Sequence, residues 1–255
     1  MTRAMFSGGK RGAVSFTYDD ALAEHLDIAM PHLESRGLRG TFYIPTRQQP
    51  KDSWHTRPAD WVAAVERGHE IGNHSQYHPC KGAASWVKPE YARERYDLAR
   101  MEAELRAAND DLDVAVGHSA ERSFAYPCCD DWVGEEHTSM RPLADQLFPV
   151  SRGGGSRQLA DPATVDFRFV PSWALVPEVP RTDILAFINE AIDLGQWAVL
   201  MFHGVGGGGH RMNVTREDHE AICQHVAERK ADLHCDTFLN VAKQLRASFN
   251  RPWAR

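Results

Sequence analysis

The sequence lacks two kinds of run that would limit it to a membrane or to nucleic acid. No stretch approaches the ~18 consecutive apolar residues of a membrane-spanning helix, and no run of lysines and arginines stands out. The formal net charge of −6 gives no general attraction to a polyanion. We therefore expect no membrane contact and no nucleic-acid partner.

An export signal is also missing from the chain as given. Residues 1–11 end in two glycines, a lysine and an arginine, where a signal peptide would need an apolar stretch. The expectation is a cytoplasmic protein, or a secreted one if a leader has been removed. Hydrophobic residues make up 42% of the chain and charged residues 25%, which is ordinary for a soluble globular protein.

Cysteine is scarce, and its pattern does not indicate a disulfide or zinc framework. The chain has five cysteines, an odd number, and no pair has the C-x-x-C spacing of a structural zinc site. Two of them are adjacent in sequence, which is a poor geometry for pairing with each other. We predict reduced, unpaired thiols at Cys80, Cys128, Cys129, Cys223 and Cys235.

Strand-like and helix-like segments alternate along the chain, without an internal repeat or a low-complexity linker. Apolar, β-branched or aromatic runs predict strands, and apolar residues at helical spacing predict helices. The predicted strands cover residues 13–18, 41–44, a short stretch around Ile71, 123–126, 148–151, 167–170 and 197–202. The predicted helices cover residues 22–36, 61–67, 89–109, 183–194, 215–229 and 238–247.

This alternation favours a parallel sheet, and at 255 residues a barrel is expected at least as much as an open sheet. We predict a single α/β domain, residues 13–255, preceded by an N-terminal extension, residues 1–12. Functional side chains should then lie where strands end and loops begin.

Asp19 and Asp20 follow directly on the first predicted strand. An aspartate at such a place commonly caps the next helix, and that interpretation stays open for one of the two. The competing interpretation is a pair of functional carboxylates at the end of a strand.

His74 and His78 follow the short strand around Ile71. Two histidines four residues apart share one face of a helical turn, so both imidazoles can reach one ion. A pair of surface histidines is the simpler alternative. The preceding Gly72 and Asn73 mark a switch from strand to turn, which is a good place for ligands.

His203 ends the apolar strand 197–202. A histidine after an apolar run is usually a core residue. Here Gly204 and the glycine run 206–209 follow it, and flexible backbone fits a histidine at the mouth of a pocket.

Together the three segments offer the groups that a metal-assisted hydrolysis needs. One carboxylate with two histidines is a ligand set that leaves positions open for water and substrate. A second carboxylate beside it can take a proton from that water, and a histidine on the far side can give one to the leaving group.

In these segments the sequence resembles the polysaccharide deacetylase family, also called the NodB-homology domain or carbohydrate esterase family 4. Residues 17–21 (TYDDA) resemble the first family motif, TFDDG, and residues 74–79 (HSQYHP) match the second, H(S/T)xxHP, fully. Residues 125–129 (AYPCC) resemble the third, RxPYG, weakly, and residues 199–203 correspond to the last, LxLxH. The similarity covers nearly the whole chain from about residue 13. Its specific part is the second motif together with the Asp-Asp pair.

The resemblance implies a distorted (β/α) barrel with about seven strands and a metal-dependent hydrolase of carbon–nitrogen or ester bonds. It implies Asp20, His74 and His78 as ligands of a divalent ion, most of all zinc, with cobalt, nickel or manganese as alternatives. The catalytic domain would be residues 13–255.

The resemblance also implies catalytic roles. Asp19 would be the general base, His203 the general acid, and the backbone N–H of Cys128 the donor to the oxyanion. The family's third-motif arginine, which orients the catalytic aspartate, is replaced here by Ala125. Arg152 is the candidate to supply that charge from another loop, against the simpler interpretation of an exposed arginine.

The sequence leaves two further features open. The fourth family motif, whose aspartate tunes the catalytic histidine, has no clear match, although Asp166 and Trp173 lie in the expected region. Four aromatic residues are candidates for a sugar-binding platform or for ordinary core or rim positions: Tyr77, Tyr126, Trp132 and Trp173.

The leading functional hypothesis is a deacetylase that releases acetate from an N-acetylated or O-acetylated sugar or polysaccharide. The altered third motif and the missing export signal support a second hypothesis, an allantoinase-like or imidase-like hydrolase of a small cyclic or linear amide. A third hypothesis is a carbohydrate-binding protein with lapsed catalysis, which the presence of the core site residues argues against. The sequence does not indicate the exact substrate, the native metal or the oligomeric state.

Overall fold

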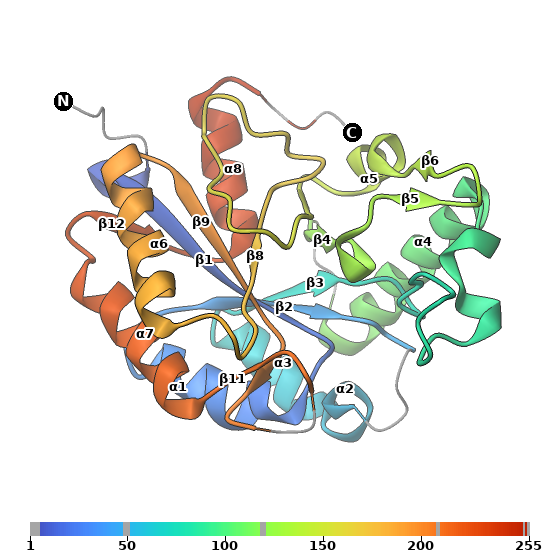
Figure 1. Ribbon diagram of the computed structural model, residues 1–255, viewed down its shortest axis with the longest axis horizontal. Helices are drawn as coiled ribbons and strands as arrows, with labels where there is room; N and C mark the ends of the chain where they lie inside the picture. The colour runs from blue at the N-terminus through green and yellow to red at the C-terminus, as the bar shows by residue number, and fades with distance from the viewer. Residues whose placement is uncertain (1–5, 48–51, 118–120, 208–209, 252, 254–255) are drawn as a thin grey trace.

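The computed structural model describes residues 6–47, 52–117, 121–207, 210–251 and 253. Part of the predicted extension, residues 1–5, and part of the predicted glycine run, residues 208–209, lie outside the described residues. A curled sheet of parallel strands fills the centre of the molecule, and helices surround it (Figure 1).

The sheet runs in the order β7-β4-β3-β2-β1-β9-β8, and each neighbouring pair is parallel. A further strand, β12, pairs with the first residues of β1 on the edge that β2 occupies further along. The bounds are β1 Gly12–Asp19, β2 Gly40–Ile44, β3 Glu70–Asn73, β4 Phe124–Ala125, β7 Ser151–Arg152, β8 Trp173–Ala174, β9 Trp197–Phe202 and β12 Leu233–Cys235. The prediction of a distorted barrel of about seven strands in a single domain is confirmed.

The two ends of this strand order meet through irregular pairing. Gly155, just beyond β7, bridges Trp173 of β8. The Gly155 amide donates to the Ser172 carbonyl at 2.9 Å, and the Ala174 amide donates to the Gly155 carbonyl at 3.2 Å. Isolated bridges therefore close the barrel where regular ladders are missing, which is the source of its distortion.

Alternation along the central strands decides which side chains enter the barrel. On β1, Val14, Phe16 and Tyr18 belong to the large core cluster beneath the outer helices. Ala13 belongs instead to the cluster inside the barrel. Because successive side chains of a strand point to opposite faces, Thr17 and Asp19 share the inner face with Ala13. The same alternation on β9 places Val199 inside, and His203 follows in that register.

Helices cover the outside of the sheet (Figure 1), while apolar residues of α8 also join the inner cluster. A π-helical turn, His25–Ala29, leads into α1. The α-helices are α1 Met30–Glu34, α2 Ser53–Thr56, α3 Pro58–Glu66, α4 Leu98–Val116, α5 Arg141–Leu147, α6 Arg181–Leu194, α7 Arg216–Glu228 and α8 Phe238–Ser248. The short 3₁₀ turns are Ser7–Gly9, Pro89–Tyr91, Arg93–Arg95 and Pro127–Cys129, and the short remaining strands are β5 Trp132–Val133, β6 Thr138–Ser139, β10 Gly204–Val205 and β11 Asn213–Val214.

The predicted helix 89–109 is wrong at both ends. Two 3₁₀ turns occupy residues 89–95, and α4 starts only at Leu98 because the Asp97 side chain accepts from the Arg100 amide at 2.7 Å and caps the helix there. At the start of α7 the Thr215 hydroxyl accepts from the Asp218 amide at 3.0 Å and caps the helix.

Three predicted strands are shorter than expected, and the strand 123–126 reduces to β4. The strand 148–151 reduces to β7, which begins at Ser151. The segment 167–170 contributes isolated pairing to residues 151–153 rather than a regular strand. Segments 148–151 and 167–170 lie where the barrel closes irregularly. Their apolar residues are buried without extended ladders, except Phe169, which is partly buried.

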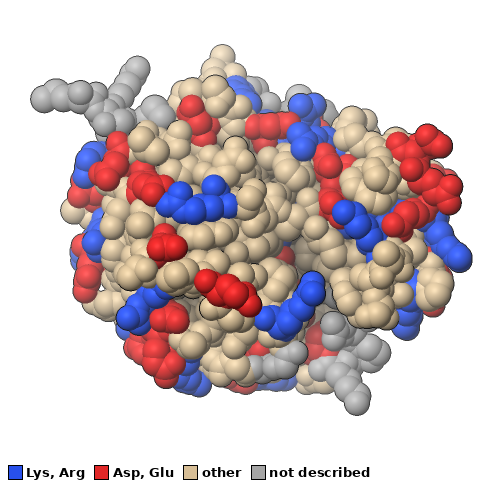
Figure 2. Space-filling model, viewed as in Figure 1, with Lys and Arg blue, Asp and Glu red and all other residues tan. Residues whose placement is uncertain are grey.

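Acidic and basic side chains are intermingled over the face of the molecule in Figure 2. Among the residues that the structure describes, no helix combines the length and the apolar character needed to cross a membrane.

Candidate functional site

Polar side chains from three central strands meet at the carboxyl end of the barrel. Asp19 ends β1, His74 follows β3, and His203 follows β9. Parallel strands bring these ends to one side of the sheet. A cavity of about 630 Å³ opens there. Its lining is Asp19, Asp20, His78, Trp86, Cys128, Cys129, Gly154, Gly155, Ala174, Met201, His203, His210, Arg211 and Met212.

Asp19 and Asp20 both face this cavity because the chain turns sharply between them. In a regular strand the two side chains would point to opposite faces. Asp20 instead has φ 78° and Ala21 has φ 50°, in the left-handed region that such residues rarely adopt. The helical segment that follows begins beyond both aspartates, at Ala23, and continues into the π-helical turn at His25. Neither aspartate therefore serves as the helix cap that the sequence left open.

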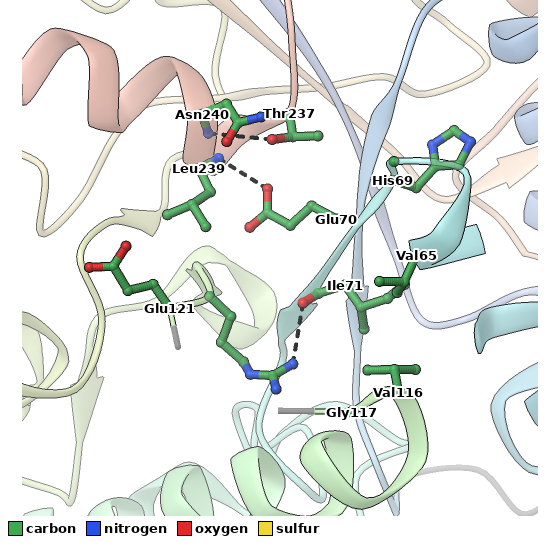
Figure 3. A pocket seen from close by; sticks show the side chains of 12 residues that line it. Val65, His69, Glu70, Ile71, Val116, Gly117, Glu121, Thr237, Leu239 and Asn240 are labelled. Carbon is green, nitrogen blue, oxygen red and sulfur yellow. Dashed lines mark hydrogen bonds between the residues drawn. The ribbon is translucent and has the colours of Figure 1, made fainter. Parts of the chain in front are cut away.

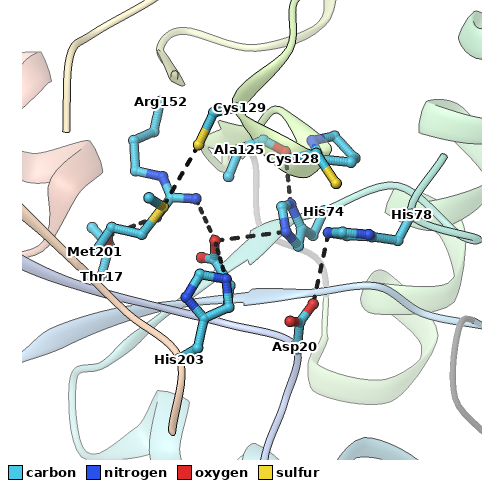
Figure 4. Close-up of polar contacts among 12 residues, drawn as sticks. Thr17, Asp20, His74, His78, Ala125, Cys128, Cys129, Arg152, Met201 and His203 are labelled. Carbon is cyan, nitrogen blue, oxygen red and sulfur yellow. Dashed lines mark hydrogen bonds and ion pairs between the residues drawn. The ribbon is translucent and has the colours of Figure 1, made fainter. Parts of the chain in front are cut away.

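Asp19 forms a buried ion pair with Arg152, whose side chain is labelled in Figure 4. One guanidinium nitrogen, Nη2, donates to Asp19 Oδ2 at 2.6 Å, and Nη1 donates to the Thr17 hydroxyl at 2.9 Å. Both partners of the pair are almost fully buried. The structure thus places the Arg152 charge, from β7, beside the aspartate, and the simpler interpretation of an exposed arginine is wrong.

This environment keeps Asp19 ionised. Burial by itself raises the pKa of the carboxyl, but the Arg152 charge, together with His74 and His203, more than offsets it and holds the pKa of Asp19 well below its usual range. The other carboxylate oxygen, Oδ1, is buried without a hydrogen-bond partner. Asp19 therefore presents a charged, unpartnered oxygen in the site.

Asp20, His74 and His78 bring three potential ligand atoms together. One atom from each lies within 4.8 Å of the other two, and His78 Nε2 is 3.7 Å from Asp20 Oδ1. Asp20 Oδ1 and His74 Nε2 are buried without a hydrogen-bond partner. Because buried polar atoms are nearly always satisfied, these orphaned atoms fit a site that binds a cation.

The two histidines converge for a reason other than the one predicted. Residues 74–78 do not form a helical turn, since Ser75 has φ 64° and His78 has φ 54°. The turn is held by the Ser75 amide, which donates to Asn73 Oδ1 at 2.7 Å, and by the His78 amide, which donates to Ser75 Oγ at 3.0 Å. It brings the two imidazole centroids to 4.6 Å.

Both imidazoles are in the neutral form that binds metal ions. Burial lowers the pKa of His74 to about 4 and that of His78 to about 3, although Asp19 opposes both shifts. His74 Nδ1 lies 2.7 Å from the Ala125 carbonyl oxygen. A proton on Nδ1 therefore satisfies that carbonyl and leaves the Nε2 lone pair facing the site, which is the usual arrangement of a metal-binding histidine.

His203 approaches the same Asp19 oxygen as His74, whose Nε2 lies 3.7 Å from Oδ2. His203 Nε2 is 3.8 Å from Asp19 Oδ2, and its Nδ1 is buried without a partner. Burial lowers the pKa of His203, while Asp19 and Asp20 oppose this. The two residues considered for the fourth motif lie elsewhere: Asp166 pairs with Arg168 and Arg141, and Trp173 packs against Phe187.

The prediction that the thiols are unpaired is wrong for two of the five cysteines. Cys80 and Cys128 form a disulfide with a Cα–Cα distance of 6.0 Å. The pairing follows from the barrel: Cys80 comes after the β3 loop and Cys128 after β4, and these strands are parallel neighbours. Cys129, Cys223 and Cys235 are free.

Cys128, whose backbone N–H the sequence suggested as a donor, lines the cavity in a left-handed conformation with φ 54°. The disulfide connects this position to the loop of His78, since Cys80 Sγ lies 3.5 Å from His78 Nδ1. One covalent link thus joins two walls of the site.

The structure adds residues that the sequence did not single out. His210 lies on the loop between β10 and β11, and its ring stacks on that of His203 at 4.7 Å with an interplanar angle of 5°. Trp86 lines the mouth, is 52% exposed, and lies 5.9 Å from the His78 ring. A lone histidine after glycines and a lone tryptophan in a loop carry no periodic signal that would have indicated them.

The four predicted platform aromatics do not line the cavity. Tyr126 and Trp173 are buried, Tyr77 stacks on Tyr91, and Trp132 stacks on His137. They are core or rim residues, which was the alternative left open.

A second cavity, of about 310 Å³, lies at the opposite end of β3 (Figure 3). Glu70 faces it, and its carboxylate accepts from the Thr41 hydroxyl at 2.8 Å, the Leu239 amide at 3.0 Å and the Ser123 amide at 3.2 Å. The Glu70 carboxylate therefore finds its hydrogen-bond donors within the protein, which fits a structural role for this residue.

Comparison with solved structures shows the fold. An acetyl xylan esterase from Clostridium thermocellum, in complex with a cobalt ion, is 18% identical, with 92% of each chain covered and a TM-score of 0.57. A peptidoglycan deacetylase, PdaC, from Bacillus subtilis is 13% identical over 94% of this chain and 95% of that one, with a TM-score of 0.55. The Puue allantoinase is 11% identical over 96% and 93%, with a TM-score of 0.62.

A comparison by sequence with curated proteins gives no match. The model of one family, described as polysaccharide deacetylase, matches residues 7–134, which is half of the chain. This segment contains both aspartates, both histidines of the second motif and the disulfide. The chain belongs to the polysaccharide deacetylase family.

Proposed function

We propose that this protein is a metal-dependent deacetylase that hydrolyses acetyl groups from an N-acetylated or O-acetylated sugar or polysaccharide and releases acetate. The observation that carries the proposal is the ligand group Asp20, His74 and His78, within 4.8 Å of one another, beside the ionised Asp19 that Arg152 holds. Two of the proposed ligands, Asp20 and His78, line one cavity with Asp19 and His203, which supports the proposal.

The orphaned atoms of the ligand group fit a divalent ion. Two neutral imidazoles and one carboxylate match zinc, with cobalt, nickel or manganese as alternatives. When bound, the ion would supply a Lewis acid that polarises the acyl carbonyl and lowers the pKa of water.

The chain's own residues then have separate tasks. Asp19 accepts a proton from the attacking water, and Arg152 keeps its carboxylate charged and fixed. The backbone N–H of Cys128 donates to the oxygen on which negative charge develops, a contribution of about 3 kcal/mol in other hydrolases. His203 protonates the departing amine or alcohol, and a lowered pKa makes its imidazolium a stronger acid.

A sugar substrate is supported by the mouth of the cavity. Trp86 is half exposed there, and an exposed indole face suits stacking on a sugar ring. Two of the similar solved structures are an acetyl xylan esterase and a peptidoglycan deacetylase, and both names refer to acetylated polysaccharides.

The test is acetate release from N-acetylglucosamine oligomers and from acetylated xylan, with and without chelator, with Asp19→Asn as the inactive control. We expect release from at least one substrate, loss on chelation and recovery on adding zinc. Activity that chelation leaves unchanged would contradict the metal-dependent mechanism.

A hydrolase of small amides is the second candidate, favoured by the fold match to an allantoinase over 96% of this chain. The same assay with allantoin and a cyclic imide separates the two. Turnover of these and of no acetylated sugar would replace the deacetylase proposal. A wild type that binds sugar but turns over no substrate would instead indicate a binding protein.

The Cys80–Cys128 disulfide bears on location. Disulfides persist mainly in oxidising compartments, so we propose that the protein works in one, against the cytoplasmic expectation from the sequence. Thiol labelling of protein taken directly from its native cells tests this, with three labelled cysteines expected after denaturation and five contradicting it.

A further inference from the structure

We propose that Asp20, His203 and His210 form a second, weaker divalent-cation site, and that filling it inhibits the enzyme. The inhibition rests on the proposed function, because it depends on His203 acting as the acid. The binding of the cation does not depend on that function.

The three side chains bring their ligand atoms within 4.8 Å of one another. His210 Nε2 lies 3.9 Å from Asp20 Oδ2, and the His203 and His210 rings are parallel at 4.7 Å. Two imidazoles and a carboxylate are a set that zinc binds well.

The backbone holds His210 in this position. The pairing of β10 with β11 returns the chain over His203, and Gly204 and Gly206 donate to the Met212 and Val214 carbonyls at 2.9 Å and 2.8 Å. His210 Nδ1 lies 3.2 Å from the Met212 carbonyl oxygen and 3.2 Å from the Met212 amide nitrogen, so Met212 can bond to either neutral form of the ring. In the form with its proton on Nδ1, the ring donates to the carbonyl and the Nε2 lone pair is free for a cation beside Asp20.

One buried atom without a hydrogen-bond partner supports the assignment. It is His203 Nδ1, so one nitrogen of that ring remains available. Asp20, more than nine-tenths buried, has one oxygen, Oδ1, near His78 and the other, Oδ2, near His210. The Asp20 carboxylate can therefore offer one oxygen to the site of His74 and His78 and the other oxygen to the site of His203 and His210.

The second site should be the weaker of the two. His74 and His78 are buried, whereas the side chains of His203 and His210 are 12% and 27% exposed. Two divalent ions that share one carboxylate also repel each other. We expect an affinity at least about tenfold lower than that of the first site, the scale on which surrounding groups change metal affinity.

Filling the second site removes the acid. A cation on His203 occupies the lone pair that must carry the proton for the leaving group. The rate should therefore rise up to one equivalent of zinc and fall as zinc increases beyond it.

The experiment measures metal stoichiometry and rate together. Metal-free wild type, His210→Ala, His74→Ala and His234→Ala are titrated with zinc under equilibrium dialysis, and with cobalt(II) by visible absorption. His234 is a matched control, because it lies on β12, away from this site, and its Nε2 is 3.9 Å from Asp236 Oδ2. Each rate is normalised to the same variant's value at one equivalent.

We expect two equivalents for wild type and His234→Ala, and one tight equivalent without inhibition by excess zinc for His210→Ala. His74→Ala should lose the tight equivalent and keep the weak one. A single equivalent in wild type, or unchanged stoichiometry and inhibition in His210→Ala, would overturn the second site. If no variant shows turnover, the proposed function fails while the stoichiometry still decides this proposal.

Discussion

Arg152 donates to Asp19 across the interior of the barrel, over 2.6 Å in space and 133 residues in sequence. The arginine comes from β7, which lies at one end of the strand order, and the aspartate comes from the central strand β1. We propose that this pair takes the place of the arrangement that the family's third motif would provide, and the proposal can be tested directly.

Replacing Arg152 by methionine should lower kcat/KM about 100-fold, within the range of general-base effects. Without the guanidinium, burial raises the pKa of Asp19, so the acidic limb of the pH–rate profile should move to higher pH. Rates measured from pH 4 to 9 test this. Arg168→Met is the control, since that arginine forms an exposed pair with Asp166. An acidic limb at the wild-type position would show that Arg152 does not set the charge of Asp19.

The metal content of variants should distinguish the role of His203 from that of His74. His203→Ala should lower turnover by about 100-fold or more while keeping one tightly bound ion. His74→Ala should lose that ion, because it removes one of three ligands. Metal analysis after dialysis gives the answer, and equal occupancy in the two variants would contradict the assignment.

Breaking the disulfide should lower both the stability of the protein and its kcat/KM. The loop between Cys80 and Cys128 spans 48 residues, and the chain-entropy model gives a stabilisation of about 4 kcal/mol. Guanidinium unfolding of the Cys80→Ser/Cys128→Ser variant should show this loss, and kcat/KM should fall because His78 and the Cys128 amide are no longer held together. The variant should not respond to dithiothreitol, whereas the wild type should fall to the variant's level.

Stability should decrease below about pH 6.5, the unperturbed pKa of histidine. Burial holds the pKa of His219 well below that value and lowers the pKa of His25 to about 4. The unfolded chain therefore binds protons in this range that the folded protein does not, and each such histidine costs about 1.4 kcal/mol per pH unit until its folded pKa is reached.

His219→Gln tests the pH dependence, because glutamine does not titrate and can still bond to Tyr18, whose hydroxyl lies 2.7 Å from His219 Nε2. Urea unfolding at pH 7.5 and pH 5.5 should show a smaller loss in the variant than in the wild type. The same loss in both proteins would rule out His219 as a source.

Trp86→Ala should raise KM for an acetylated oligosaccharide about fivefold, the scale of one ring-stacking contact, with little change in kcat. Steady-state kinetics on an oligosaccharide and on a small acetyl ester separate binding from chemistry. Trp132→Ala is the control, because Trp132 stacks on His137 outside the cavity. An unchanged KM for the oligosaccharide would remove Trp86 from the proposed sugar contact.

The fold class and the placement of the site residues could be predicted because their signals are local. Asp19, Asp20, His74 and His78 occur in short motifs at the ends of apolar strands, and parallel strands bring such ends together. The boundaries of α4 were harder, because an apolar stripe does not reveal where a helix starts, although Asp97 carried a capping signal.

Contacts between residues that are far apart in the sequence could not be predicted in the same way. Arg152 was a candidate, but only the closed barrel places it against Asp19. The partner of Cys80 depends on which strand lies beside β3, which no spacing specifies. His210 depends on the path of the loop between β10 and β11, and a single histidine after glycines does not report that path.

The segment that the family model matches ends at residue 134, before Arg152 and His203. A fragment that ended there would keep Asp20, His74 and His78. It would lack two neighbours of Asp19, the cationic Arg152 and the proposed proton donor His203. The proposed chemistry therefore needs the complete ring of strands, because a gene fragment that ended at residue 134 would encode the proposed ligands of the cation without Arg152 or the proposed acid His203.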